Sequence, residues 1–292
     1  MNGNRYLPLL MTTGAALLWA SSFSVVKVGL RYIDPYSFVL LRFVVAAAVL
    51  LTIGLSTGQV SELARYMRDR YALLLGLTLA ASFCLQFRGQ TETTAAKSAM
   101  IINASVVLVA PMSVLLLRER MGLRKAAALG LGLCGVYLVT RSPGDGVLGT
   151  ETLKGNLLVS GSALAYAFYV VLTKLAISRR TFKEIPLVTA VFLWSLPVFL
   201  AASVPGLAAG LSINRNAWMA VGYLAVFCSV LPFILWTAAL KHIGALTSAI
   251  VLLAELVFGV LIAYIFLGET VSKGVVAGCT LICVGILTIR KE

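Results

Sequence analysis

The stretch Gly14-Ala-Ala-Leu-Leu-Trp19-Ala20 returns 147 positions later as Gly161-Ser-Ala-Leu-Ala-Tyr166-Ala167. Further along the chain, a shift of 150 places Glu119 on Glu269. Because the two shifts differ by only three residues, short loop insertions reconcile them. Self-similarity at a fixed period is the signature of a repeated structural unit. The sequence therefore predicts two copies of one unit.

The composition is that of a membrane protein. Of 292 residues, 60% are apolar and only 12% are charged, and the mean hydropathy is +0.97. A soluble globular domain is about half apolar and about a quarter charged, so this class is excluded, as are disordered chains and disulfide-rich scaffolds. The five cysteines lie in apolar stretches without a CxxC spacing, which predicts small core residues rather than ligands.

Ten stretches are candidates to cross a bilayer, which takes about 20 mostly apolar residues in a helix. The predicted fold is all-α, with ten transmembrane helices arranged as two inverted five-helix repeats. The first repeat covers residues 1–141, an inter-repeat loop residues 142–154, and the second repeat residues 155–292. The spans lie near residues 7–30, 36–55, 71–87, 95–117, 126–140, 155–176, 186–209, 217–239, 244–267 and 272–289.

The odd number of spans in each copy and the basic residues set the orientation. Since five is odd, the sixth span starts on the face opposite the first, so the copies run antiparallel through the membrane. Fourteen Lys and Arg residues fall in loops on one face and seven on the other, which places both termini in the cytoplasm. The net charge of +13 indicates anionic lipid headgroups rather than nucleic acid. We expect a multi-pass protein of the cell inner membrane that retains its first span.

Each half of the chain carries short motifs near the ends of its spans. The second half carries Ile243-Gly-Ala-Leu-Thr-Ser-Ala249, Glu255 and Phe266-Leu-Gly-Glu269, and the first half carries Ala95-Ala-Lys-Ser-Ala99 and Leu117-Arg-Glu119. In these motifs the chain resembles EamA-type members of the drug/metabolite transporter superfamily, and it looks closest to the YddG-like branch, which exports aromatic amino acids. The resemblance implies export of amino acids, with aromatic ones favoured. Many relatives have Pro where this chain has Leu256, which puts a proline kink there in doubt.

Glu255 is predicted to lie about halfway along the ninth span. A charge at that depth costs roughly 2.5–3.5 kcal/mol on insertion scales, so the side chain is expected to face the bundle interior, a partner or water. Two interpretations stay open. The carboxylate either binds protons or a substrate ammonium, or it forms a hydrogen bond that only holds two spans together.

Aromatic and polar residues within the spans predict a substrate cavity. Trp19 and Tyr166 occupy matching repeat positions near the middle of their spans, although these residue types usually prefer the membrane interface. Asn103 needs a hydrogen-bond partner, which is either another helix or a ligand. The remaining candidates, each of which ordinary helix packing also explains, are Ser22, Gln86 and Trp236. An apolar pocket with a few polar anchors suits an amphipathic ligand bearing a ring.

Five other charged residues are gate or charge-pair candidates: Lys27, Lys174, Arg42, Glu119 and Glu269. The two lysines are repeat mates near opposite faces, where each either holds a substrate carboxylate or extends to the headgroups. Arg42 lies deeper, and Asp34 or a backbone carbonyl is its expected partner in a structural role. The two glutamates end their spans beside basic residues and are expected to form loop-anchoring ion pairs.

Several other kinds of site are not expected. The stretch Gly130-Leu-Gly132-Leu-Cys-Gly135 fits the GxGxxG pattern but follows no predicted strand, and its glycines predict a close-packing helix surface. No catalytic residue, metal site or cofactor is expected, since His242 is the single histidine and no Walker A sequence occurs.

The sequence thus predicts a secondary transporter, not an enzyme, that works by alternating access with a central cavity between the repeats. Its expected partners are a small-molecule substrate and the lipid bilayer, and a monomer is favoured. Proton exchange through Glu255 and facilitated diffusion both stay open. The alternatives are export of other metabolites or drugs, such as nucleotide-sugar-like compounds and cationic drugs, and, less favoured, an intramembrane enzyme or a channel.

Overall fold

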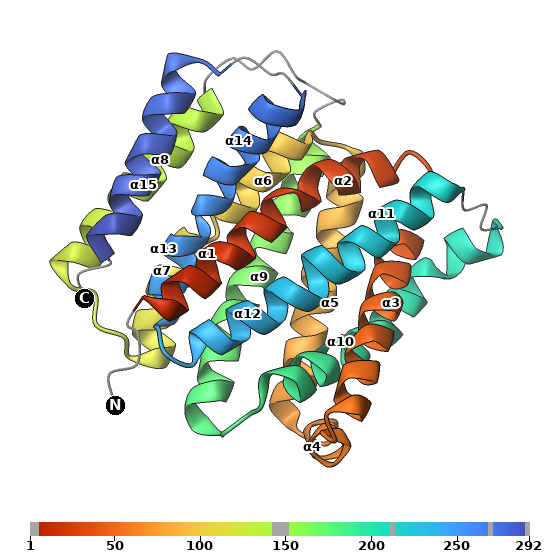
Figure 1. Cartoon of the computed structure of the whole chain (residues 1–292). Helices are drawn as coiled ribbons and strands as arrows, with labels where there is room; N and C mark the ends of the chain where they lie inside the picture. Colours follow the sequence, from red (N-terminus) through yellow and green to blue (C-terminus); the bar gives the residue numbers. More distant parts are fainter. Residues whose placement is uncertain (1–5, 142–151, 211–213, 268–270, 290–292) are drawn as a thin grey trace.

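The computed structural model describes residues 6–141, 152–210, 214–267 and 271–289, and within these ranges it is helical with short connections and no strand (Figure 1). The helices of the first half are α1 Leu7–Ala20, α2 Ser22–Gly29, α3 Pro35–Ser56, α4 Val60–Tyr66, α5 Arg70–Thr91, α6 Ala95–Asn103, α7 Val106–Leu117 and α8 Leu123–Arg141. Those of the second half are α9 Leu153–Arg179, α10 Glu184–Ala208, α11 Arg215–Ala225, the π-helix Val226–Val230, α12 Leu231–Leu240, α13 Ala245–Leu252, α14 Ala254–Leu267 and α15 Lys273–Ile289.

Eight helical stretches among the described residues are long and apolar enough to cross a membrane. They are Leu7–Gly29, Pro35–Ser56, Arg70–Thr91, Ala95–Leu117, Leu153–Arg179, Glu184–Ala208, Arg215–Leu240 and Ala245–Ile262. These stretches coincide to within a few residues with eight of the predicted spans. The other two, expected near residues 126–140 and 272–289, form α8, of 19 residues, and α15, of 17 residues. An all-helical chain with many apolar spans is therefore confirmed.

Two of the spans break at corresponding places in the two halves. The first break separates α6 from α7, and the second separates α13 from α14. At each break an amide donates to the carbonyl three residues earlier, from Ser105 to Ile102 at 3.0 Å and from Leu256 to Leu253 at 3.1 Å. Bonds of this 3₁₀ type tighten a helix locally. The second break forms with Leu256, and not a proline, directly after Glu255, so a proline is not needed for it.

The helices of the two halves interlock along a common core. Helix α5 packs along α9, α3 along α10, and α1 along α12. The ring of Phe43 on α3 lies 4.8 Å from that of Phe192 and 4.9 Å from that of Phe199, both on α10, between centroids. Such aromatic pairs contribute about 0.5–1.5 kcal/mol each beyond their buried area. The core therefore lies at the seam between the halves.

Helices α8 and α15 form a closely packed pair at one edge of the bundle (Figure 1). A Cβ atom at Gly135 would lie 2.6 Å from the carbonyl oxygen of Gly278, and one at Gly278 would lie 2.6 Å from that of Gly135. No side chain fits at either position, which confirms the predicted close-packing surface for Gly135. A Cβ at Gly130 would meet no other part of the protein within 4 Å, so this glycine is not part of the contact.

Candidate transport site

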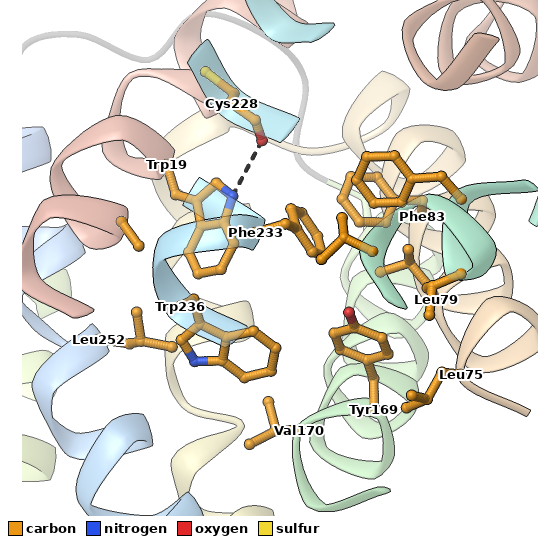
Figure 2. Close-up of a cluster of buried hydrophobic side chains, with 14 of the residues drawn as sticks. Trp19, Leu75, Leu79, Phe83, Tyr169, Val170, Cys228, Phe233, Trp236 and Leu252 are labelled. Atoms are coloured by element: carbon orange, nitrogen blue, oxygen red, sulfur yellow. Dashed lines mark hydrogen bonds between the residues drawn. The ribbon is translucent and has the colours of Figure 1, made fainter. Parts of the chain in front are cut away.

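Four aromatic side chains from three helices meet in the interior of the bundle (Figure 2). Between ring centroids, Trp19 of α1 lies 5.2 Å from Phe233 and 6.2 Å from Trp236, both on α12. Tyr169 of α9 contacts the same two rings at 6.1 and 5.7 Å. Each of the four side chains is more than nine-tenths buried. These four residues are called the aromatic cluster below.

The indole N–H groups of the aromatic cluster are bonded within the protein. Trp236 Nε1 donates to Ser248 Oγ at 2.9 Å, and Trp19 Nε1 donates to the carbonyl of Cys228 at 3.1 Å. That carbonyl cannot receive the usual α-helical bond from four residues on, because Pro232 has no N–H. The chain around it is the π-helix Val226–Val230, a form that often occurs at functional sites.

Glu255 lies in the first turn of α14 and is 8% exposed. Its carboxylate lies close to the side-chain amide of Asn103 on α6 and to the Tyr166 hydroxyl on α9. Asn103 Nδ2 also donates to the carbonyl of Ala99 at 2.8 Å. The ring of Tyr166 stacks on that of Tyr169 at 6.3 Å between centroids. One aromatic ring therefore joins the buried carboxylate to the aromatic cluster.

The structure brings together five of the seven residues predicted for the cavity: Trp19, Asn103, Tyr166, Trp236 and Glu255. Ser22, buried in α2, and Gln86, half-buried in α5, make no side-chain hydrogen bond or ring contact to this group within the described residues. Tyr169 and Phe233 belong to the group but are not among the predicted residues. Each stands three positions from a predicted aromatic residue, a spacing that puts both on one face of a helix.

The two lysines that a shift of 147 relates bind backbone carbonyls at helix ends. Lys27 Nζ donates to the carbonyls of Gln90 and Thr93, both at 2.7 Å. Lys174 Nζ donates to the carbonyl of Leu240, also at 2.7 Å. Gln90 and Leu240 are themselves related by the shift of 150. Cations near the last carbonyls of a helix satisfy groups that have no intrahelical partner, so the two lysines make the same kind of contact at two helix ends.

Glu119 caps a helix of the other half. Its Oε1 accepts from the amide of Ala245 at 2.6 Å and its Oε2 from that of Leu246 at 3.3 Å. The expected ion pair with neighbouring arginines is thus replaced by a bond to the N-terminus of α13, where a negative charge is stabilising. Gly244 permits the approach, since a Cβ there would lie 2.7 Å from Oε2. Glu269, the predicted repeat mate, lies outside the described residues.

Arg42 is almost fully buried on α3, at 2% exposure. Its Nη2 donates to the carbonyl of Cys228 at 2.7 Å and its Nε to Ser229 Oγ at 2.8 Å. Of the two partners that the sequence suggests, the backbone carbonyl is therefore the one present. Asp34 instead caps α3, accepting from the amides of residues 36 and 37 at 3.1 Å.

Ion pairs outside the spans join the loop between α9 and α10 to the first half. Lys183 Nζ lies 2.5 Å from Glu62 Oε1, and Arg180 pairs with Asp69. The hydrogen bond from Lys183 lowers the pKa of Glu62 to about 2. These contacts lie in loops that the sequence assigns to the basic face.

The comparisons with known proteins identify the family. The EamA-like transporter family matches residues 7–141 and 153–290, and the chain belongs to this family, as its motifs predict. An uncharacterized transporter of Archaeoglobus fulgidus is 27% identical over 92% of this chain and 91% of its own. A protein named probable terminal-alkyne amino-acid exporter, from Streptantibioticus cattleyicolor, is 24% identical over 94% of this chain and 90% of its own. A crystal structure that is 19% identical has the same fold, with a TM-score of 0.77 over 98% of this chain and 97% of that chain.

Proposed function

We propose that this chain is a secondary transporter that exports small organic metabolites, with amino acids, and aromatic ones above all, as substrates. The observation that carries the proposal is the buried carboxylate of Glu255, one ring away from the aromatic cluster. Ring faces attract other rings and cations, and a carboxylate adds a partner for an ammonium group. The amino-acid exporter of S. cattleyicolor, which matches most of both chains, supports the same substrate class.

The proposed architecture is two inverted five-span repeats, residues 1–141 and 155–292, joined by the loop 142–154. Three observations support it: the family matches both stretches, the helix breaks correspond, and Lys27 and Lys174 make equivalent bonds. Inverted repeats in transporters enclose the substrate site between them and open it to one face at a time. Alternating access is therefore the mechanism that we propose.

The bond between Glu119 and α13 is the proposed gate on the cytoplasmic face. Glu119 belongs to the first repeat and α13 to the second, so separation of the repeats at this face breaks the bond. Lys174 binds the carbonyl of Leu240 at the end of α12. The turn at residues 241–244 is therefore held at both ends, by Lys174 before it and by Glu119 after it. The gate is closed while both contacts persist.

The proposed location is the cell inner membrane, with both termini in the cytoplasm and the chain acting as a monomer. The driving force is either proton exchange through Glu255 or the solute gradient itself. A pH step across proteoliposomes separates the two, since only proton exchange makes the substrate flux follow the imposed gradient.

Counterflow in proteoliposomes tests the proposal directly. Vesicles loaded with unlabelled phenylalanine, tryptophan, a sugar nucleotide or a cationic drug are placed in labelled phenylalanine. We expect uptake with the aromatic amino acids inside, saturating with concentration as a carrier requires, and a large loss of uptake in Glu255→Gln. The control is Asp34→Asn, which removes a carboxylate outside the spans and keeps the side-chain oxygen that caps α3. Counterflow of a labelled drug or sugar nucleotide, in vesicles that show none of labelled phenylalanine, would overturn the amino-acid assignment.

A further inference from the structure

Arg42 carries a buried charge that no acidic group among the described residues balances. Its guanidinium forms no ion pair with any residue that the structure describes. It stands about 10 Å along α3 from the start of the helix, since seven residues at 1.5 Å each separate it from Pro35. An ionised side chain at such a depth is costly and normally marks a functional site. The charge therefore needs an explanation.

Three aromatic rings surround the guanidinium. The Cζ atom of Arg42 lies 5.0 Å from the ring centroid of Phe83, 5.6 Å from that of Phe43 and 6.0 Å from that of Phe87. Ring faces attract a cation, but they carry no net charge. They exclude water and leave the positive charge without a counter-charge, which strengthens its attraction for any anion that enters.

A structural role explains the hydrogen bonds of Arg42 but not its charge. The carbonyl of Cys228, which loses its usual donor to Pro232, already accepts a bond from Trp19. The hydroxyl of Ser229 is itself anchored, since it donates to the carbonyl of Leu224 at 3.0 Å. Neutral donors can satisfy the same two acceptors, so these bonds do not by themselves require a buried charge. Within the described residues Nη1 makes no hydrogen bond, so one edge of the planar group is uncommitted.

We propose that Arg42 is the receptor for the carboxylate of the transported substrate. This inference rests on the proposed function and narrows it to substrates that carry a carboxylate. Guanidinium and carboxylate match in a planar, two-bond geometry, and bonds between charged groups are stronger than those to the neutral oxygens that Arg42 now holds.

The position of Arg42 suits an aromatic amino acid. The carbonyl of Cys228 links the guanidinium to Trp19 of the aromatic cluster, because both donate to it. Arg42 and Glu255 both lie near Cys228. Opposite charges thus lie around one set of rings, as a zwitterion with an aromatic side chain requires.

Binding of a ligand pair that differs only in the carboxylate tests the inference. Phenylalanine and phenylalanine amide are titrated by calorimetry into the purified full-length protein and into Arg42→Met and Arg42→Lys. We expect the wild type to bind phenylalanine about tenfold or more tightly than the amide, as a lost hydrogen bond to a charged group implies. Arg42→Met should lose this preference, and Arg42→Lys should keep part of it. Arg65→Met, which removes an exposed arginine that stacks on Tyr66, is the matched control and should bind as the wild type does.

Three results would overturn the inference. One is a preference for phenylalanine that survives in Arg42→Met. The second is equal affinity of the wild type for the two ligands, which needs no variant and so decides the matter even if Arg42→Met fails to fold. The third is binding in Arg42→Lys that equals the wild type for both ligands. A wild type that binds no amino acid at all would instead contradict the proposed function, and the inference would fall with it.

Discussion

Removal of the Glu119 carboxylate should loosen the face that we propose to be cytoplasmic. The first amides of any helix lack an intrahelical partner, and at α13 the N-cap position is Gly244, which has no side chain to supply one. The two carboxylate oxygens of Glu119 take that place, at 2.6 and 3.3 Å. In Glu119→Ala, the amides of Ala245 and Leu246 lose both bonds.

The size of the effect follows from measured helix caps. Loss of an N-cap bond costs about 0.5–2 kcal/mol. In the proposed gate this bond exists only while the cytoplasmic face is closed, so its loss destabilises one state alone. The ratio of closed to open protein should therefore fall about 2- to 30-fold, because each 1.4 kcal/mol is a factor of ten.

Cysteine labelling from one face measures that ratio. Ala249, on α13, is 7% exposed, and a cysteine there, in a chain otherwise free of cysteine, should react with an impermeant maleimide when the cytoplasmic face opens. The labelling rate should rise about 2- to 30-fold in Glu119→Ala, in line with the cap energy. Gly244→Val should also raise the labelling rate, because a Cβ at this position would lie 2.7 Å from Glu119 Oε2 and displace the carboxylate.

The control is Glu92→Ala. Glu92 pairs with Lys154 at 2.9 Å and Arg88 at 2.8 Å, on the face that the sequence assigns to the outside. It is likewise a contact between the halves, but it should leave labelling from the cytoplasm unchanged or slower. An unchanged rate in Glu119→Ala, or an equal rise in both variants, would refute the assignment of Glu119 as the cytoplasmic gate.

Three further predictions concern activity, packing and pH. Initial counterflow of phenylalanine should fall about tenfold or more in Glu255→Gln, because a bond to a charged group is lost, and an unchanged rate would contradict a role in transport. Gly135→Ala should destabilise the detergent-solubilised protein by about 1–3 kcal/mol through overpacking, whereas Gly130→Ala, with no neighbour near its Cβ, should leave the thermal midpoint unchanged. The hydrogen bond from Lys183 lowers the pKa of Glu62 to about 2. The ion pair therefore contributes fully to the free energy of unfolding above the ordinary pKa of a carboxyl group, and this contribution is lost as the pH falls through about 2. The thermal midpoints of the wild type and Glu62→Gln should thus differ at neutral pH and converge toward pH 2.

The spans were predictable because they depend on local composition. A run of about 20 apolar residues can satisfy its backbone in lipid only as a helix, so the ends of α3 and of the stretch Ala95–Leu117 follow almost directly from the sequence. The interior positions of Trp19, Trp236 and Glu255 were partly predictable, since residues that do not belong in lipid turn toward the interior.

The partners of the charged residues were less predictable, because they depend on which segments meet in space. The neighbours of Glu119 in sequence are Arg118 and Arg120, and they suggest an ion pair, yet its carboxylate bonds to amides 126 and 127 residues away. The Cys228 carbonyl that receives Arg42 is freed by Pro232, and this signal can be read only once the contact between α3 and the π-helix is known. Sequence patterns reveal that a polar group needs a partner, but not which partner it finds.

The proposed repeat distinguishes residues that hold helix ends together from residues that we assign to substrate binding. Lys27 and Lys174 make the same bond in both copies, as expected of contacts that both faces need when each opens and closes in turn. Glu255 has Ser105 as its counterpart at a shift of 150, and Arg42 has Thr189 at a shift of 147, so neither charge is duplicated. One substrate bound between two halves needs a single receptor for each of its charges, and a second copy would leave another buried charge unpaired in lipid. The unduplicated charges are therefore the ones that we assign to the substrate.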